Sequence, residues 1–129
     1  MKVFKNGWFE RFARKQRITN RAMLDAIDRA ERGRIDADLG GGVIKQRLAR
    51  PGQGKSGGFR TIVLYRTSER AFFVYGFAKS DRADIDADEA AMFKKAATHV
   101  LGLSDAQLAE LIAKGQFSEV KRNGEEISE

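Results

Sequence analysis

Cysteine is absent from the 129 residues, and proline and histidine each occur only once. Without cysteine the chain cannot form disulfides, thiolate zinc sites, iron–sulfur clusters or a cysteine nucleophile. No apolar run approaches the ~18 residues that a membrane-spanning helix needs. No apolar segment follows Met1, so we also expect no secretory signal. We therefore expect one cytoplasmic domain with a single core and no contact with a membrane.

The sequence also shows no histidine paired with an acid for acid–base catalysis. His99 lies within a helical stripe, with no serine or acid at a fixed partner spacing, so we expect it on a helix surface or in packing and not in catalysis. Any acid–base catalysis at neutral pH must then use other groups. The nucleotide-binding P-loop is excluded as well, because Ala49 stands where the first glycine before Gly54-Lys55-Ser56 is required.

A run of aspartates superficially resembles a calcium-binding loop. Counted from Asp84, however, the sixth position is Glu89 instead of glycine and the twelfth is Lys95 instead of glutamate. Helix capping explains these acids better, since carboxylates stabilise the positive end of a helix dipole. We therefore expect neither a metal nor another cofactor.

Charge is distributed unevenly along the chain. Residues 1–79 hold 18 Lys and Arg against 7 Asp and Glu, whereas residues 80–129 hold 6 against 11. Within residues 39–79 there are eight basic groups and one acid, Glu69. A basic block followed by an acidic segment indicates a surface that binds a polyanion. An ordinary solvated surface with uneven charge is the alternative.

Hydrophobic periodicity predicts an α+β domain over residues 1–117, followed by a polar tail over 118–129 that we expect to be disordered. The order β-α-α-β-β-β-α-α predicts a mostly antiparallel sheet. Capping boxes at Asp86/Glu89 and Ser104/Gln107 mark the starts of the last two helices. The predicted elements are strands at 1–5, 42–49, 59–66 and 71–79 and helices at 8–17, 20–32, 87–101 and 105–114.

Basic side chains concentrate on or between the three middle strands. They are Lys45, Arg47, Arg50, Lys55, Arg60, Arg66 and Lys79. Because side chains alternate along a strand, Arg60 and Arg66 share one face, as do Lys45 and Arg47. Together these groups can form a concave basic surface for a phosphodiester backbone. Tyr65, Tyr75 and Phe77 are candidates for stacking on unpaired bases, with core packing as the alternative.

Two stretches of this region resemble the RelE/ParE superfamily of toxins from type II toxin–antitoxin modules, and within it the RelE-like, HigB-type branch. The first runs Gly54-Lys55-Ser56-Gly57-Gly58-Phe59-Arg60-Thr61-Ile62-Val63-Leu64-Tyr65-Arg66. The second runs Phe72-Phe73-Val74-Tyr75-Gly76-Phe77-Ala78-Lys79. The resemblance covers residues 1 to about 117. It implies a microbial-ribonuclease-like fold, with a curved sheet covered by two N-terminal helices and by the C-terminal helices.

The resemblance also implies a ribosome-dependent endoribonuclease that cuts mRNA and has no cofactor. A cognate antitoxin with a helix-turn-helix domain would neutralise it, and the complex would bind operator DNA through the antitoxin. Carried over by position, Arg60, Lys79 and Lys55 are the candidate catalytic residues. Some members use a C-terminal His or Tyr as the acid, which this chain lacks, so Lys79 or Tyr75 would have to serve. The expected RNA-binding residues are Lys45, Arg47, Arg50, Arg66 and Tyr75.

Two alternatives remain open at this point. A ParE-like toxin would inhibit DNA gyrase by binding it, without any chemistry of its own. A non-catalytic RNA-binding module would keep the basic surface and lose the cleavage reaction. The basic strands favour RNA over gyrase, because a row of cations along a sheet matches the repeating charge of a nucleic-acid backbone.

Overall fold

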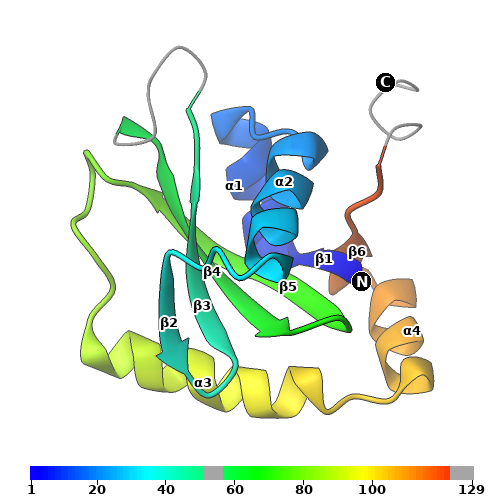
Figure 1. Ribbon diagram of the computed structural model, residues 1–129. Coiled ribbons are helices and arrows are strands. Elements are labelled where there is room, and N and C mark those ends of the chain that lie inside the picture. Colours follow the sequence, from blue (N-terminus) through cyan, green and yellow to red (C-terminus); the bar gives the residue numbers. More distant parts are fainter. Residues whose placement is uncertain (51–56, 123–129) are drawn as a thin grey trace.

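The computed structural model describes residues 1–50 and 57–122. The described helices are α1 (Gly7–Gln16), α2 (Asn20–Glu31), α3 (Ala87–Leu101) and α4 (Asp105–Ala113). The described strands are β1 (Lys2–Asn6), β2 (Ala37–Gly40), β3 (Val43–Leu48), β4 (Phe59–Arg66), β5 (Arg70–Ala78) and β6 (Phe117–Glu119). Figure 1 shows α1 and α2 against one face of the sheet and α3 running along the other. No described helix is both long and apolar enough to cross a bilayer.

One six-stranded sheet organises the fold, in the order β2-β3-β4-β5-β1-β6. Only β1 and β5 pair in parallel, and the other neighbours are antiparallel. The predicted α+β class with a mostly antiparallel sheet is therefore confirmed. The parallel pair arises because the chain crosses through α1, α2 and the β3–β4–β5 meander before β5 returns beside β1.

Two edge strands, β2 and β6, were not predicted. They hold four and three residues, which is too short for an alternating pattern to stand out in the sequence. β6 pairs with β1, and the backbone N–H of Val120 donates to the carbonyl of Val3 at 2.7 Å. Residues 118–119, placed by the sequence pattern in a polar tail, therefore belong to the sheet, and Val120 is bonded to it. The side chain of Val120 is buried.

Separate apolar cores fill the two faces of the sheet. The core beneath α1 and α2 includes Phe9, Ile27, Phe59 and Phe73. The core beneath α3 and α4 includes Phe4, Leu64, Phe72 and Phe93. Both predicted capping boxes are present, at the first turns of α3 and α4. The helices that cover the second core therefore begin where the sequence predicted.

Two local features bring α1 and α2 close to the sheet. A Cβ at Gly76 would lie 2.8 Å from Cε2 of Phe12, so only glycine lets α1 approach β5 this closely. Gln46 is fully buried beneath α2, where its amide donates to the carbonyls of Ala26 and Arg34 and accepts from the N–H of Asp36. These bonds satisfy a polar group that would otherwise destabilise the core.

Candidate nucleic-acid interface

The sheet face beneath α3 is divided into an apolar half and a basic half. Val43 lies opposite Leu64 on β4, and both belong to the core under α3. Four residues further along β3, Arg47 lies opposite Arg60, which in turn lies opposite Phe77 of β5. We call this second half the basic face and define it by the residues Lys45, Arg47, Arg60, Tyr75, Phe77 and Lys79.

A β-bulge in β5 places the aromatic residues on the basic face. Ile62 pairs with Tyr75, but the next residue, Val63, pairs with Phe73, so Val74 is the extra residue. A bulge shifts the alternation of the following side chains by one position. Tyr75 therefore lies opposite Ile62, on the same face as the arginines. Without the bulge, strict alternation from Phe72 would have placed Tyr75 on the opposite face of the sheet.

Neither Arg47 nor Arg60 forms an ion pair with the residues that the structure describes. The Nη1 atom of Arg60 is buried and has no hydrogen-bond partner among residues 1–50 and 57–122. A buried donor on a cation is costly to leave unpaired, and such atoms need an explanation when they occur. An anion bound at this position would satisfy it.

Tyr75 is half-buried at the border between the two halves of the face. Its ring centroid lies 4.6 Å from that of Trp8, 5.9 Å from that of Phe93 and 6.2 Å from that of Phe77. Packing and a polar role are therefore combined in one side chain, since its hydroxyl is hydrogen-bonded. These contacts agree with the core alternative drawn from the sequence, and stacking of Tyr75 on a base stays a prediction.

Arg82 joins the basic face from the connection between β5 and α3, a role that the sequence did not predict. Its Nη1 donates to the Tyr75 hydroxyl at 2.9 Å, and its guanidinium lies 5.8 Å from the ring centroids of both Tyr75 and Phe77. Arg82 also forms a two-pronged ion pair with Glu89. Hydrogen bonding to Glu89 raises the pKa of Arg82 and lowers the pKa of Glu89.

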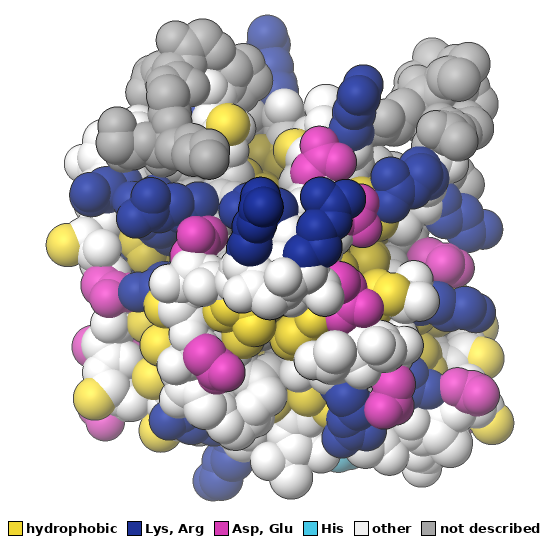
Figure 2. Space-filling view, viewed as in Figure 1, with side chains coloured by type: hydrophobic (Ala, Val, Ile, Leu, Met, Phe, Trp, Pro, Cys, Tyr) yellow, Lys and Arg dark blue, Asp and Glu magenta, His cyan; other side chains and the backbone are white. Residues whose placement is uncertain are grey.

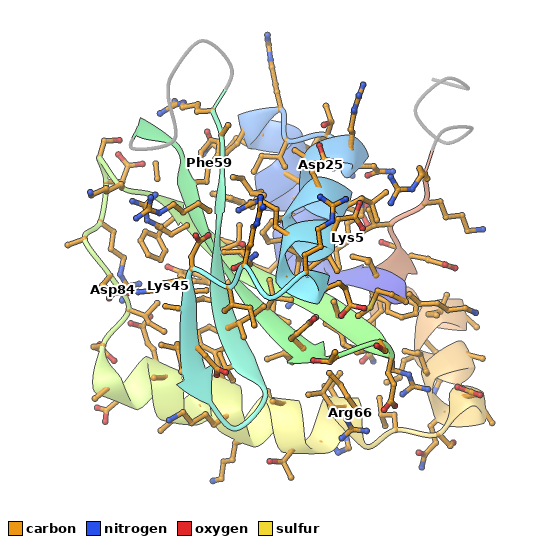
Figure 3. The ribbon with its side chains drawn as sticks, in the orientation of Figure 1. Lys5, Asp25, Lys45, Phe59, Arg66 and Asp84 are labelled. Atoms are coloured by element: carbon orange, nitrogen blue, oxygen red, sulfur yellow. The ribbon has the colours of Figure 1, made fainter. Side chains whose placement is uncertain are left out.

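Lys45 is paired with an acid from the same connection. Its Nζ lies 2.9 Å from both carboxylate oxygens of Asp84. Figure 3 shows the two side chains next to one another at the side of the sheet. The hydrogen bond from Lys45 holds the pKa of the Asp84 carboxyl below its ordinary value of 3.8. Asp84 is thus a carboxylate at neutral pH.

Lys79 has no such partner, although it lies at the same end of the sheet. Its backbone N–H donates to the carbonyl of Gly58 at 3.4 Å, which continues the β4–β5 ladder by one residue. The alternation from Tyr75 and Phe77 places its side chain on the basic face. Lys79 is exposed and forms no ion pair with any described residue. It is therefore available to an anion that approaches Arg60.

Several other predicted residues lie elsewhere. Arg66 is at the far end of β4 (Figure 3), about 20 Å along the strand from Arg60 at 3.4 Å per residue, and its Nη1 lies 3.8 Å from Glu69. The guanidinium of Arg50 lies 5.4 Å from the ring centroid of Phe59, whose side chain belongs to the core under α1 and α2. The structure does not bring these two arginines to the basic face. Lys55 lies outside the described residues.

Tyr65 does not offer a stacking surface to a base. It is buried on the opposite face of the sheet, and its hydroxyl donates to Oε2 of Glu31. Burial, reinforced by the hydrogen bond to Glu31, raises its pKa to about 12. Of the two alternatives that the sequence left open for Tyr65, stacking and core packing, the structure therefore supports core packing. The strand alternation that turns Arg60 toward α3 necessarily turns Tyr65 toward α2.

Basic side chains gather on one side of the molecule. Figure 2 shows Lys and Arg side chains gathered in a band across the upper part of one view, with a few acidic side chains between them. Within the described residues, no group of three His, Asp or Glu side chains is placed to hold a metal ion. His99 is exposed on α3, so the structure supports the helix-surface alternative and not packing. The basic face thus offers guanidinium, ammonium and phenol groups to an anion.

The sequence model that describes the RelE toxin of the RelE/RelB toxin–antitoxin system matches residues 1–120 of this chain. The chain is a member of the RelE toxin family. A search of curated protein sequences finds no match. The matched range includes β6 and ends at Val120, the last residue whose backbone bonds to β1. Membership of this RelE family makes the chain the toxin of a toxin–antitoxin pair, and it implies a cognate antitoxin as partner.

Proposed function

We propose that this RelE toxin is a ribosome-dependent endoribonuclease that cuts mRNA in the cytoplasm and is neutralised by its antitoxin. The observation that carries the proposal is that Arg47 lies opposite Arg60 without an ion pair to either side chain in the part of the chain that the structure describes. There, Nη1 of Arg60 is also buried without a hydrogen-bond partner. Like charges directly opposite one another destabilise a sheet. Two arginines kept in this position are explained by an anion that binds between them, and the phosphodiester of RNA is such an anion.

The reaction that suits these groups is attack by the RNA's own 2′-hydroxyl. The 2′-oxygen forms a bond to the adjacent phosphorus while the bond from phosphorus to the 5′-oxygen breaks. The proton of the 2′-hydroxyl passes to a base, and the 5′-oxygen receives a proton from an acid. The products are a 2′,3′-cyclic phosphate and a 5′-hydroxyl, so the reaction consumes no water.

Each charged side chain of the basic face has a part in this reaction. Arg60 binds two non-bridging oxygens of the reacting phosphate, because its planar fork matches their geometry and charge builds up on them in the transition state. Lys45 and Arg47 bind the neighbouring backbone. Lys79, together with Lys55, supplies proton transfer or a further positive charge.

Tyr75 is the second candidate for the acid. Its hydroxyl accepts a hydrogen bond from Arg82, which leaves its own proton free to be donated. Tyr75→Phe distinguishes the two acids, because it removes the proton and keeps the ring that packs against Trp8 and Phe93.

The proposed dependence on the ribosome follows from the lack of a histidine paired with an acid at the basic face. Without a histidine and acid to force proton transfer, the RNA must arrive with its 2′-hydroxyl already in line with the scissile phosphate. Holding reactants in such a geometry can supply a large share of an enzyme's rate enhancement. The ribosome holds mRNA in a fixed path at the A site and can supply it. The antitoxin, with a helix-turn-helix domain, would carry the complex to operator DNA.

Primer extension on mRNA, with and without translating 70S ribosomes, tests the proposal. We expect naked RNA to stay nearly intact and mRNA in ribosomal complexes to be cut at the A-site codon, leaving a 2′,3′-cyclic phosphate. Equal cleavage in both samples would identify a free ribonuclease. No cleavage in either, with gyrase–DNA adducts accumulating in cells, would identify a gyrase inhibitor instead.

A further inference from the structure

The chain between β5 and α3 lies across the edge of the basic face. We call residues 79–86 the connector. Figure 1 shows it passing down one side of the sheet, from the end of β5 to the start of α3. Arg82 attaches it to Tyr75 of β5, and Asp84 attaches it to Lys45 of β3. Lys45 and Tyr75 both pair with Ile62 of the intervening β4. The connector therefore spans three strands on the face where RNA is proposed to bind.

The carboxylate of Asp84 binds the ammonium of Lys45 in the way that a phosphate would. Both carboxylate oxygens lie 2.9 Å from Nζ, and one of them also accepts the backbone N–H of Ile85 at 2.8 Å. A carboxylate and a phosphate are both oxyanions that bind an ammonium through charge-assisted hydrogen bonds. Lys45 is therefore neutralised by the protein itself, while Arg47 and Arg60, on the same face, form no ion pair with the described residues.

The two partners differ in their freedom to move. The Lys45 side chain is 19% exposed, whereas that of Asp84 is 52% exposed. Asp84 can turn into water and keep its charge hydrated, but Lys45 is held in place by its surroundings. An exposed ion pair contributes little stability, because water and salt compete with it. Another anion can thus replace the carboxylate if the Asp84 side chain moves, while the Lys45 side chain stays in place.

We propose that Asp84 competes with RNA for Lys45, so that an RNA phosphate must displace its carboxylate when RNA binds to the basic face. This inference rests on the proposed function, because it takes RNA as the ligand. In the free toxin the connector lowers the affinity of the basic face for any polyanion. On RNA, the ammonium of Lys45 exchanges one oxyanion for another, and Asp84 turns toward solvent.

The second ion pair of the connector has a different role. Glu89 binds Arg82 and also accepts the backbone N–H of Asp86 at 2.9 Å as part of the α3 capping box. The Arg82 and Glu89 side chains are 30% and 28% exposed, so both are enclosed to a similar degree. Displacing Glu89 would break the helix cap as well as the ion pair. This pair holds the connector in place while Asp84 exchanges.

Binding of a fluorescently labelled single-stranded RNA, with its 2′-hydroxyls methylated to prevent cleavage, tests the competition. Asp84→Asn should lower the dissociation constant about fivefold at moderate salt, which matches the upper range for a partly exposed ion pair. Glu110→Gln is the matched control, because it removes the same charge from an exposed pair with Lys114 on α4. We expect that control to change the constant by less than about twofold.

A double-mutant cycle with Lys45 separates competition from a general change of charge. In a Lys45→Gln background, Asp84→Asn should give no further gain, because the contested cation is gone. Thermal unfolding of each variant checks that the fold is intact. Equal tightening by Asp84→Asn and Glu110→Gln would overturn the proposal, since net charge alone would then be responsible. Weaker binding of Asp84→Asn would also overturn it, because Asp84 would then position Lys45 for RNA.

The same binding titration distinguishes a failure of this inference from a failure of the proposed function. Wild-type binding that depends on Arg60, without tightening by Asp84→Asn, would reject only the competition. Wild-type binding that Arg60→Ala leaves unchanged would reject the basic face as the RNA surface, and with it the proposed function. The absence of binding by every variant would reject both.

Discussion

Arg47 and Arg60 lie directly opposite one another on β3 and β4, and neither side chain forms an ion pair with the described residues. The protein thus keeps two like charges at neighbouring positions of its sheet, where they repel one another. Natural proteins give up stability in this way mainly at functional sites. The pairing of β3 with β4 thus places two cations side by side, where the proposed reaction needs to bind a phosphate.

Replacing one of the two arginines should therefore stabilise the protein while weakening its function. We expect Arg47→Gln to raise the free energy of unfolding by about 0.5 kcal/mol, since repulsion across a strand pair is of that order. Urea unfolding measures the change, and RNA affinity should fall in the same variant. A loss of stability in Arg47→Gln would show that the arginine is held by contacts and not merely tolerated.

Phe93 on α3 should be a major contributor to the second core. It is buried among Leu64, Phe72 and neighbouring residues, so Phe93→Ala leaves a cavity and should cost about 3–5 kcal/mol. Met92, the preceding residue on the same helix, is 57% exposed, and Met92→Ala should change stability by less than about 0.5 kcal/mol. Urea unfolding compares the two. Similar losses in both variants would mean that helix propensity, not packing, is being measured.

Tyr65 should make stability fall at alkaline pH. Its pKa is about 12 in the folded protein against 10.0 in the unfolded chain, so the fold favours the neutral phenol. The resulting stabilisation is complete below pH 10 and is lost between pH 10 and 12, where the unfolded chain ionises first. Wild type should lose stability across this range more steeply than Tyr65→Phe. Parallel curves for the two proteins would show that the phenol ionises alike in both states.

The sequence predicted most of the fold because its local patterns agree with the tertiary structure. Asp86/Glu89 and Ser104/Gln107 begin helices where their side-chain bonds can form, and the β4–β5 hairpin follows from two aromatic strands around a short turn. The edge strands β2 and β6 are too short to carry a pattern. They are held by pairing with β3 and β1, which are distant contacts that local periodicity does not reveal.

The candidate site was predicted less completely, for reasons that also lie in tertiary structure. Alternation within one strand correctly joined Arg60 to Arg66 on a face, but it could not show that only one end of that face is free of α3. The bulge at Val74 is invisible in the sequence, yet it decides where Tyr75 points. Arg82 follows the last strand of the meander and reaches back to it across seven positions.

Arg60 holds the reacting phosphate in the proposed mechanism, and single-turnover cleavage of mRNA in translating 70S complexes measures that role at the chemical step. Arg60→Ala should lower the cleavage rate at least about 100-fold, because it removes a donor to the transition state. Arg66→Ala is the matched control on the same strand and face, and its rate should stay within about twofold of wild type. Circular dichroism confirms that both variants are folded. A folded Arg60→Ala toxin that cuts at the wild-type rate, or an equal loss in Arg66→Ala, would refute this role of Arg60.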